Sequence, residues 1–474
     1  MAISPSTLAS GYHALRDDGR DGASVRNGAR LMEAERARRF AFASRAGATP
    51  LRIARSEGVW LYTDEGRQIL DASGGAIVVG IGHGRREVAE AYAREAERLA
   101  YAIPPFASEA RVRLVERLVD SWLPRGLTRV GFTSGGSESV EAALRIARAH
   151  FVAAGQPKRW QVIGRDLSYH GTTFATLAVG GHTKRRKGFE PWLADLPKAP
   201  ACYCYRCPLG RSLPGCDVAC ADGVEAAILR AGPENVAAVI AEPIGGSTAG
   251  ALVPPDGYWP RLAEICKRHG VLLIADEVMT GFGRTGKRFA VDHWGVTPDI
   301  LVGGKGLASG YAPMGGIFAS ESVVAPVIEQ GQEFMFFTYS AHPASCAAAE
   351  KVLEILEREQ LVERAARMGE ILGKRLARLL DHPNVGDVRG RGLLWAVELV
   401  ADKSSGTPFP AEAGLTAKIV AAGIAHGVFV YPGGVDPARD VISFGPPFTI
   451  AEDEIELLAS RFEQALESAL ARVR

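Results

Sequence analysis

The sequence carries almost no net charge, because its 55 lysines and arginines are matched by 54 aspartates and glutamates. This balance leaves no broad basic face, so nucleic acid and anionic membranes are not expected partners. Long apolar runs are also missing, and none approaches the roughly 20 residues needed to span a bilayer. The opening residues, MAISPSTLASGYHALRDDGRDG, lack the apolar core of a signal peptide, so we expect a cytoplasmic location.

Cysteine is scarce as well, with seven in 474 residues, which excludes a disulfide framework as the basis of stability. A chain of this length can bury a large core and, at roughly 100–200 residues per domain, should form two to four domains. We interpret residues 1–48, rich in Arg, Ala and Ser, as an N-terminal extension. Residues 49–84 contain a predicted β-hairpin, VWLYTDEGRQILDAS, with its turn at Asp64-Glu65-Gly66.

From residue 85 to 343, helical and strand patterns alternate. Short apolar runs bounded by Gly, Pro or charge include VGFT, WQVIG, VAAVIAEP, VLLIADEV and DILVGG. This alternation predicts an α/β fold with a mostly parallel central sheet flanked by helices. Residues 344–474 form a different, α+β unit: one long helical run, then strands around GLLWAVELV, VFVYPG and VISFGP, and a closing helix from Glu452.

Two loops in the central region carry groups suited to bind an anion or a flat ring. In Phe132-Thr133-Ser134-Gly135-Gly136-Ser137, glycines, a hydroxyl and a helix start can cradle phosphate, because backbone N–H groups and the helix dipole favour an anion. An ordinary tight turn is the alternative, and the dinucleotide pattern G-x-G-x-x-G is absent. In Tyr169-His170-Gly171 the aromatic ring either stacks on a heteroaromatic cofactor or fills the core.

Two charged residues follow buried strands. Asp276 ends VLLIADEV, where open α/β sheets bind ligands, and its carboxylate either holds a pyridinium nitrogen protonated or caps the next helix. Lys305 stands between glycines in DILVGGKGLASG. Burial would lower the pKa of its amine and free it to attack a carbonyl or aldehyde, whereas an ordinary surface lysine is the alternative. The P-loop pattern is not met, because Asp299 and Gly306 stand where it needs a glycine and a hydroxyl.

Taken together, these blocks resemble class III aminotransferases of the fold type I pyridoxal-phosphate enzymes, from about residue 50 to the C-terminus. The matching blocks are FTSGGSESVEAALRIAR, SYHGTT, AEPI, IADEVMTGFGRTG, GGKGLASGYAPMGG and FTYSAHP. The resemblance implies a large cofactor-binding domain over residues 85–343 and a small domain built from residues 49–84 and 344–474. It also implies a homodimer with shared active sites, and a tetramer is compatible with it.

The resemblance also implies roles for individual residues. Those expected at the cofactor are Gly136 and Ser137 at its phosphate, Tyr169 and Val278 on its two ring faces, Asp276 at its ring nitrogen, and Thr338 at the phosphate in the other subunit. Lys305 would hold pyridoxal phosphate as a Schiff base and then move a proton as general base. Glu242, near the cofactor's 3-hydroxyl side and the substrate, would complete the catalytic set.

The implied activity is transamination, in which an amino group passes from an amine or ω-amino acid donor to a keto acid or aldehyde acceptor. Residues expected near the substrate are Ile77, Ser247 and Arg439, the last as a mobile partner for an acceptor carboxylate. Two alternatives stay open. One is another reaction of this cofactor, a decarboxylating transamination or an aminomutase reaction, and the other is an inactive binding or regulatory homologue.

A cluster of cysteines stands outside this scheme. Cys204, Cys207, Cys216 and Cys220, with Cys202 just upstream, have spacings compatible with a tetrahedral thiolate zinc site. Such a zinc ion would be structural, because four thiolates leave no open position for water. The alternative is reduced cysteines packed as small hydrophobic side chains, and we expect metal-free protein.

Overall fold

The computed structural model describes residues 51–103, 105–331 and 337–473, so the extension predicted for residues 1–48 lies outside the described residues. The chain divides into two compact units. The described residues of the first unit are 51–54 and 63–66, and those of the second lie within 55–62 and 67–473. In the first unit the Gly66 N–H donates to the Thr63 carbonyl at 3.0 Å, which confirms the predicted turn. Arg52 and Asp64 form an ion pair there at 3.3 Å.

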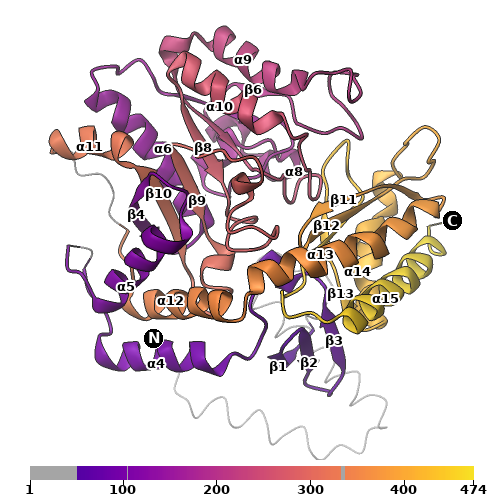
Figure 1. Cartoon of the computed structure of the whole chain (residues 1–474). Helices are drawn as coiled ribbons and strands as arrows, with labels where there is room; N and C mark the ends of the chain where they lie inside the picture. Colours follow the sequence, from indigo (N-terminus) through magenta and orange to yellow (C-terminus); the bar gives the residue numbers. More distant parts are fainter. Residues whose placement is uncertain (1–50, 104, 332–336, 474) are drawn as a thin grey trace, which may run out of the picture. The chain divides into compact units, whose positions relative to one another are not determined.

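A seven-stranded sheet lies in the second unit, with the strand order β4-β10-β9-β8-β7-β5-β6 (Figure 1). Its strands are β4 (Leu127–Thr133), β5 (Gln161–Arg165), β6 (Lys198–Ala199), β7 (Val236–Ala241), β8 (Leu272–Asp276), β9 (Ile300–Gly303) and β10 (Gly315–Ser320). Strands β6, β5, β7, β8 and β9 pair in parallel, whereas β10 is antiparallel to both β9 and β4. The predicted mostly parallel sheet is confirmed.

Helices cover both faces of this sheet, which is why its central strands β7, β8 and β9 are fully buried. All six residues of β7 are buried. Ala238 and Ile240 pack in one core cluster with α6 (Gly136–Ala153), while Val239 and Ala241 pack in the other with α9 (Ala219–Ala231) and α10 (Tyr258–His269). Successive side chains of a strand point to opposite faces, so both periodic sets must be hydrophobic. Further helices are α7 (Phe174–Val179), α8 (Thr183–Arg186) and α11 (Glu321–Glu329).

The helices around residues 86–122 and 343–377 differ in detail from the prediction. Helices α4 (Arg86–Arg98) and α5 (Glu109–Arg117) form as expected, but α5 continues as a π-helical segment, Leu118–Trp122. The single long run predicted after residue 343 is wrong, because it forms two helices, α12 (Pro343–Arg358) and α13 (Leu361–Ala377). Gln360 breaks the run with a left-handed φ of 50°. Helix α12 packs on α4 and α5, whereas α13 packs on β11 (Val385–Arg391) and α15 (Glu452–Leu470), so tertiary contacts impose the break.

Segments from the two ends of the chain share a sheet. Strands β1 (Ile53–Glu57), β2 (Trp60–Thr63), β3 (Gln68–Asp71) and β13 (Val428–Phe429) form one four-stranded sheet, and β13 pairs in parallel with β3. A second sheet has the order β11-β12-β15-β14. Its elements and neighbours are β11 (Val385–Arg391), β12 (Leu394–Leu399), β14 (Tyr431–Gly433), β15 (Val441–Phe444), α3 (Gly74–Ile77), α14 (Leu415–Ala425) and α15 (Glu452–Leu470). The predicted hairpin and closing helix are both confirmed. Within the described ranges, no helix is long and apolar enough to cross a membrane.

Candidate active site

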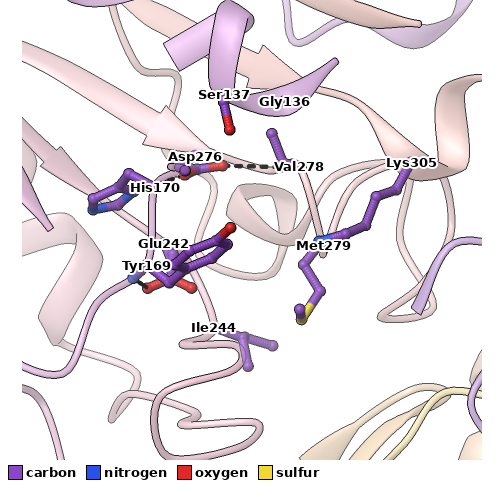
Figure 2. A pocket seen from close by; sticks show the side chains of 11 residues that line it. Gly136, Ser137, Tyr169, His170, Glu242, Ile244, Asp276, Val278, Met279 and Lys305 are labelled. Carbon is purple, nitrogen blue, oxygen red and sulfur yellow. Dashed lines mark hydrogen bonds and ion pairs between the residues drawn. The ribbon is translucent and has the colours of Figure 1, made fainter. Parts of the chain in front are cut away.

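A cavity of about 170 Å³ lies at the carboxyl ends of the central strands (Figure 2). Strand β4 runs parallel to β9, because both are antiparallel to β10, so β4, β5, β7, β8 and β9 all end at this edge. Ligands bind at this edge in open α/β sheets. Seven residues singled out from the sequence line the cavity: Gly136, Ser137, Tyr169, Glu242, Asp276, Val278 and Lys305. Four further lining residues had no predicted role: His170, Gly171, Ile244 and Met279.

The N-terminus of α6 forms one wall of the cavity. Gly136 and Ser137 occupy its first two positions, where backbone N–H groups have no partner within the helix. The Ser137 hydroxyl oxygen accepts a hydrogen bond from the Thr172 N–H at 3.2 Å. A Cβ atom on Gly136 would lie 2.7 Å from Val278 Cγ1, and one on Gly171 would lie 2.6 Å from Ser137 Oγ. Only glycine therefore keeps this wall open, and a helix N-terminus with a hydroxyl suits a phosphate.

A buried carboxylate and a buried imidazole meet on another side of the cavity. His170 Nδ1 lies 2.7 Å from Asp276 Oδ2, and the Val278 N–H donates to Asp276 Oδ1 at 3.1 Å. Both side chains are almost fully enclosed, with exposed fractions of 3% for His170 and 4% for Asp276. His170 Nε2 has no hydrogen-bond partner among the described residues. Two contacts therefore hold the Asp276 carboxylate in one orientation. The role of His170 was missed in the sequence, although it directly follows the stacking candidate Tyr169.

Lys305 enters the cavity from the side opposite His170 in Figure 2. It begins the 3-10 turn Lys305–Leu307 after β9. Its φ is 36°, a backbone conformation that residues other than glycine rarely adopt. Burial lowers the pKa of its amine, and the Asp276 and Glu242 carboxylates partly offset this effect. A lysine with a lowered pKa supplies more neutral amine at a given pH. It is therefore suited to attack a carbonyl or an aldehyde.

Glu242 connects two loops at the base of the cavity. Its carboxylate accepts hydrogen bonds from the Gly246 N–H at 2.9 Å and from the Tyr169 N–H at 3.2 Å. Burial raises the pKa of Glu242, whereas His170 and Arg165 oppose this shift. The Arg165 guanidinium also donates to the Glu242 carbonyl at 2.6 Å. Glu242 thus fixes the backbone beside Tyr169 and beside Gly246.

The three residues predicted near the substrate do not line this cavity. Ile77 is buried with a left-handed φ of 57°, in the same apolar cluster as the lining residue Ile244. Ser247 follows Gly246, and its hydroxyl is buried without a partner among the described residues. Arg439 pairs with Asp436 at 2.6 Å. Ile77 therefore shares a cluster with a lining residue, Ser247 follows the glycine whose N–H donates to Glu242, and Arg439 is engaged by an acidic neighbour.

Thr338, predicted to reach the cofactor of a second subunit, does not line this cavity either. Thr338 is exposed to solvent and begins the turn of residues 338–341. That position is compatible with a contact made outside its own chain, which is the role the resemblance gives it.

Zinc binding by the cysteine cluster was the alternative to the metal-free protein that we expect from the sequence. Cys202 and Cys220 bring their sulfur atoms to 3.6 Å, while Cys204, Cys207 and Cys216 line a separate small cavity with Cys220. In the part of the chain that the structure describes, no three His, Cys, Asp or Glu side chains are placed to hold a metal ion. The sequence spacing alone did not show how the loop would orient its thiols.

The fold and the site together define a fold type I pyridoxal-phosphate transferase. A mostly parallel sheet with one antiparallel strand presents, at its carboxyl edge, a helix N-terminus suited to an anion, a buried carboxylate and a lysine. The model of the family described as aminotransferase class-III matches residues 41–466. The chain belongs to the class III aminotransferases, and its reaction is transamination.

Known proteins agree with this assignment. The chain is 35% identical to the omega-amino acid–pyruvate aminotransferase of Pseudomonas putida over 430 aligned residues. The alignment covers 89% of this chain and 93% of that protein. It superposes with a TM-score of 0.85 on a thermostable (S)-enantioselective omega-transaminase from Thermomicrobium roseum, at 37% identity over 99% of this chain and 100% of that one. The omega-transaminase of Pseudomonas jessenii in complex with PMP gives a TM-score of 0.87 at 32% identity, covering 93% and 98% of the two chains. The family depends on pyridoxal phosphate, and its substrates are an amine and a keto acid.

Proposed function

We propose that this chain binds pyridoxal phosphate through Lys305 and transfers an amino group from a primary amine or ω-amino acid to a keto acid. The observation that carries the proposal is the meeting of three groups in one cavity: the α6 N-terminus, the Asp276 carboxylate and the Lys305 amine. Each group matches one part of the cofactor. Those parts are an anionic phosphate, a basic ring nitrogen and an aldehyde.

The residues present fit this cofactor by their own chemistry. The wall at Gly136 and Gly171 is open only because both lack a Cβ, and it exposes N–H donors of a helix start. Among the described residues, the one ion-pair partner of Asp276 is His170. The remaining lone pairs of its carboxylate are suited to accept a hydrogen bond from a protonated ring nitrogen. Tyr169 and Val278 both line the cavity and offer apolar surface to a flat ring.

When bound, pyridoxal phosphate supplies an aldehyde that takes up the amino group and a conjugated ring that accepts electrons as the substrate C–H bond breaks. Lys305 Nζ would be the point of attachment and, once released, the base that moves the proton of the substrate carbon. Asp276 would keep the ring nitrogen protonated, so that positive charge stands where electrons accumulate. Glu242 would keep Tyr169 and the 246–250 loop in place during these steps.

His170 supports Asp276, and its removal should therefore slow the reaction without removing the cofactor. We expect His170→Phe to lower kcat about tenfold, from the loss of one hydrogen bond to a charged group. The pH profile of kcat should also change, because the orientation of Asp276 controls protonation of the ring. Steady-state kinetics from pH 6 to 10 would measure both effects. His426→Phe, at the end of α14 and bonded to Ser468, is the matched control. An unchanged pH profile in His170→Phe would contradict the positioning role.

The proposed donor and acceptor classes rest on the relatives, one of which is named for ω-amino acids and pyruvate. Purified protein should be assayed with β-alanine and 1-phenylethylamine as donors, each with pyruvate or 2-oxoglutarate, and with L-alanine as donor to 2-oxoglutarate. We expect the carbonyl product of the donor and the amino form of the acceptor in equal amounts. Release of carbon dioxide, or rearrangement of an amino acid without a carbonyl product, would instead indicate another reaction of the same cofactor.

We also propose a homodimer in which Thr338 contacts the cofactor phosphate of the partner. Thr338→Ala should remain dimeric but bind pyridoxal phosphate about tenfold more weakly, since one hydrogen bond to a charged group is lost. Thr338→Ser, which keeps the hydroxyl, should restore affinity. Light scattering would give the assembly, and titration of the apoprotein would give the affinity. A fully active monomer would overturn the proposed assembly.

A further inference from the structure

A short basic segment lies beside the cavity, and two of its cationic side chains donate hydrogen bonds to backbone carbonyls. Helix α8 (Thr183–Arg186) is followed by Lys187, so four basic residues stand in a row. The Lys184 amine donates to the Gly434 carbonyl at 2.9 Å. The Arg186 guanidinium donates to the carbonyls of Ala178 at 2.9 Å and Gly180 at 3.2 Å, and also to that of Leu177. These contacts anchor the segment on both sides.

Arg185 lies between the two anchored residues and is held against the cavity wall. Its guanidinium carbon lies 4.8 Å from the centre of the Tyr169 ring, and Tyr169 lines the cavity. Its donors have no carboxylate or carbonyl partner among the described residues, and the side chain is exposed to solvent. The guanidinium also lies close enough to oppose the burial that raises the pKa of the Tyr169 hydroxyl. Arg185 is therefore a positioned cation with free donors.

The cavity itself is poorly equipped to accept an acidic substrate. Two carboxylates line it, Glu242 and Asp276, and Lys305 is the one lysine or arginine among the described lining residues. Binding a further carboxylate beside two others in a buried cavity is unfavourable in free energy unless a cation pairs with it. Arg439, the arginine expected to serve this purpose, is paired with Asp436 at 2.6 Å. A guanidinium presents two parallel donors that match a carboxylate.

We propose that Arg185 binds the carboxylate of an acidic substrate at the Tyr169 side of the cavity. This inference rests on the proposed transamination of amines and keto acids. It assigns acceptance of a keto acid to a residue of α8 that needs no rearrangement of an existing ion pair. A bound carboxylate would take up the free donors of Arg185, while the Tyr169 ring continues to pack against the guanidinium.

The test compares acceptors that differ in the carboxylate, using the holoenzyme and 1-phenylethylamine, a donor without one. For Arg185→Ala we expect the KM for pyruvate to rise about tenfold to a hundredfold, the loss of a charge-assisted interaction. The KM for butanal, an aldehyde without a carboxylate, should stay within about twofold, because no such interaction is lost. Arg185→Lys should recover part of the affinity for pyruvate. Lys187→Ala, which removes an exposed cation from the same segment, is the matched control.

A second pair of substrates shows whether Arg185 binds the carboxylate of the donor as well as that of the acceptor. With β-alanine as donor and butanal as acceptor, a higher KM for β-alanine in Arg185→Ala shows that the donor carboxylate uses the same residue. Equal losses with pyruvate and butanal would mean a structural effect and would overturn the inference. So would weaker cofactor binding, which would point to a phosphate contact, or an equal effect of Lys187→Ala.

Binding of propanoate, followed by NMR titration, gives a readout that needs no turnover. Propanoate should bind to the wild-type protein more tightly than it binds to the Arg185→Ala variant. Equal affinities would overturn the role of Arg185 even if the enzyme is active. Absence of transamination in wild-type protein would instead overturn the proposed function, whatever the propanoate result.

Discussion

Replacing Lys305 with alanine should lower the rate of transamination by at least about 10⁴-fold, because both the covalent attachment point and the proton-moving base are lost. The neighbouring carboxylates Glu242 and Asp276 cannot replace it, since both remain needed where they are. The measurement is the release of acetophenone from 1-phenylethylamine with saturating pyruvate and added pyridoxal phosphate. The protein should still fold, because among the described residues no hydrogen bond or ion pair depends on the Lys305 side chain.

Lys287→Ala is a suitable control, because Lys287 is exposed and lies outside the cavity. It should retain wild-type activity. If Lys305→Ala kept more than about a tenth of wild-type turnover, a difference too small for the loss of the covalent base, the assignment of Lys305 would be wrong.

Replacing Asp276 with asparagine should lower the transamination rate by about 10²-fold to 10³-fold while the cofactor stays bound. Asparagine keeps an oxygen for the Val278 N–H and nearly the same volume, so the change removes mainly the negative charge. Without that charge, the ring nitrogen loses its proton more readily and accepts electrons less well. Single-turnover kinetics of the amine half-reaction would measure the effect.

Asp256→Asn makes the same isosteric change at an exposed position and should have no effect. Near-wild-type rates in Asp276→Asn, with cofactor fully bound, would contradict the role of the carboxylate. Loss of the cofactor itself would show that Asp276 serves retention rather than electron acceptance.

The position of the site could be predicted because it depends on strand ends. Apolar runs mark β4, β5, β7, β8 and β9, and parallel strands bring their carboxyl ends to one edge. Residues that follow those runs, such as Ser137, Tyr169, Asp276 and Lys305, were therefore expected to meet, and all four line one cavity.

Other features depend on contacts between distant segments, which periodicity does not encode. His170 touches Asp276 across 106 positions of the chain, and no spacing rule links them. The break at Gln360 carries neither Gly nor Pro, and it follows from the different neighbours of α12 and α13. The orientation of the thiols in the cysteine loop depends on backbone geometry for the same reason. The free donors of Arg185 became visible only once the partners of Lys184 and Arg186 were known.

The most direct test of the central claim is chemical identification of the lysine that carries the cofactor. Wild-type protein saturated with pyridoxal phosphate should be reduced with borohydride, digested, and analysed by mass spectrometry. The account predicts a phosphopyridoxyl group on Lys305, near one per chain, and no such group once an amine donor has been added before reduction. A phosphopyridoxyl group on a different lysine, or labelling of Lys305 that an amine donor does not prevent, would contradict it.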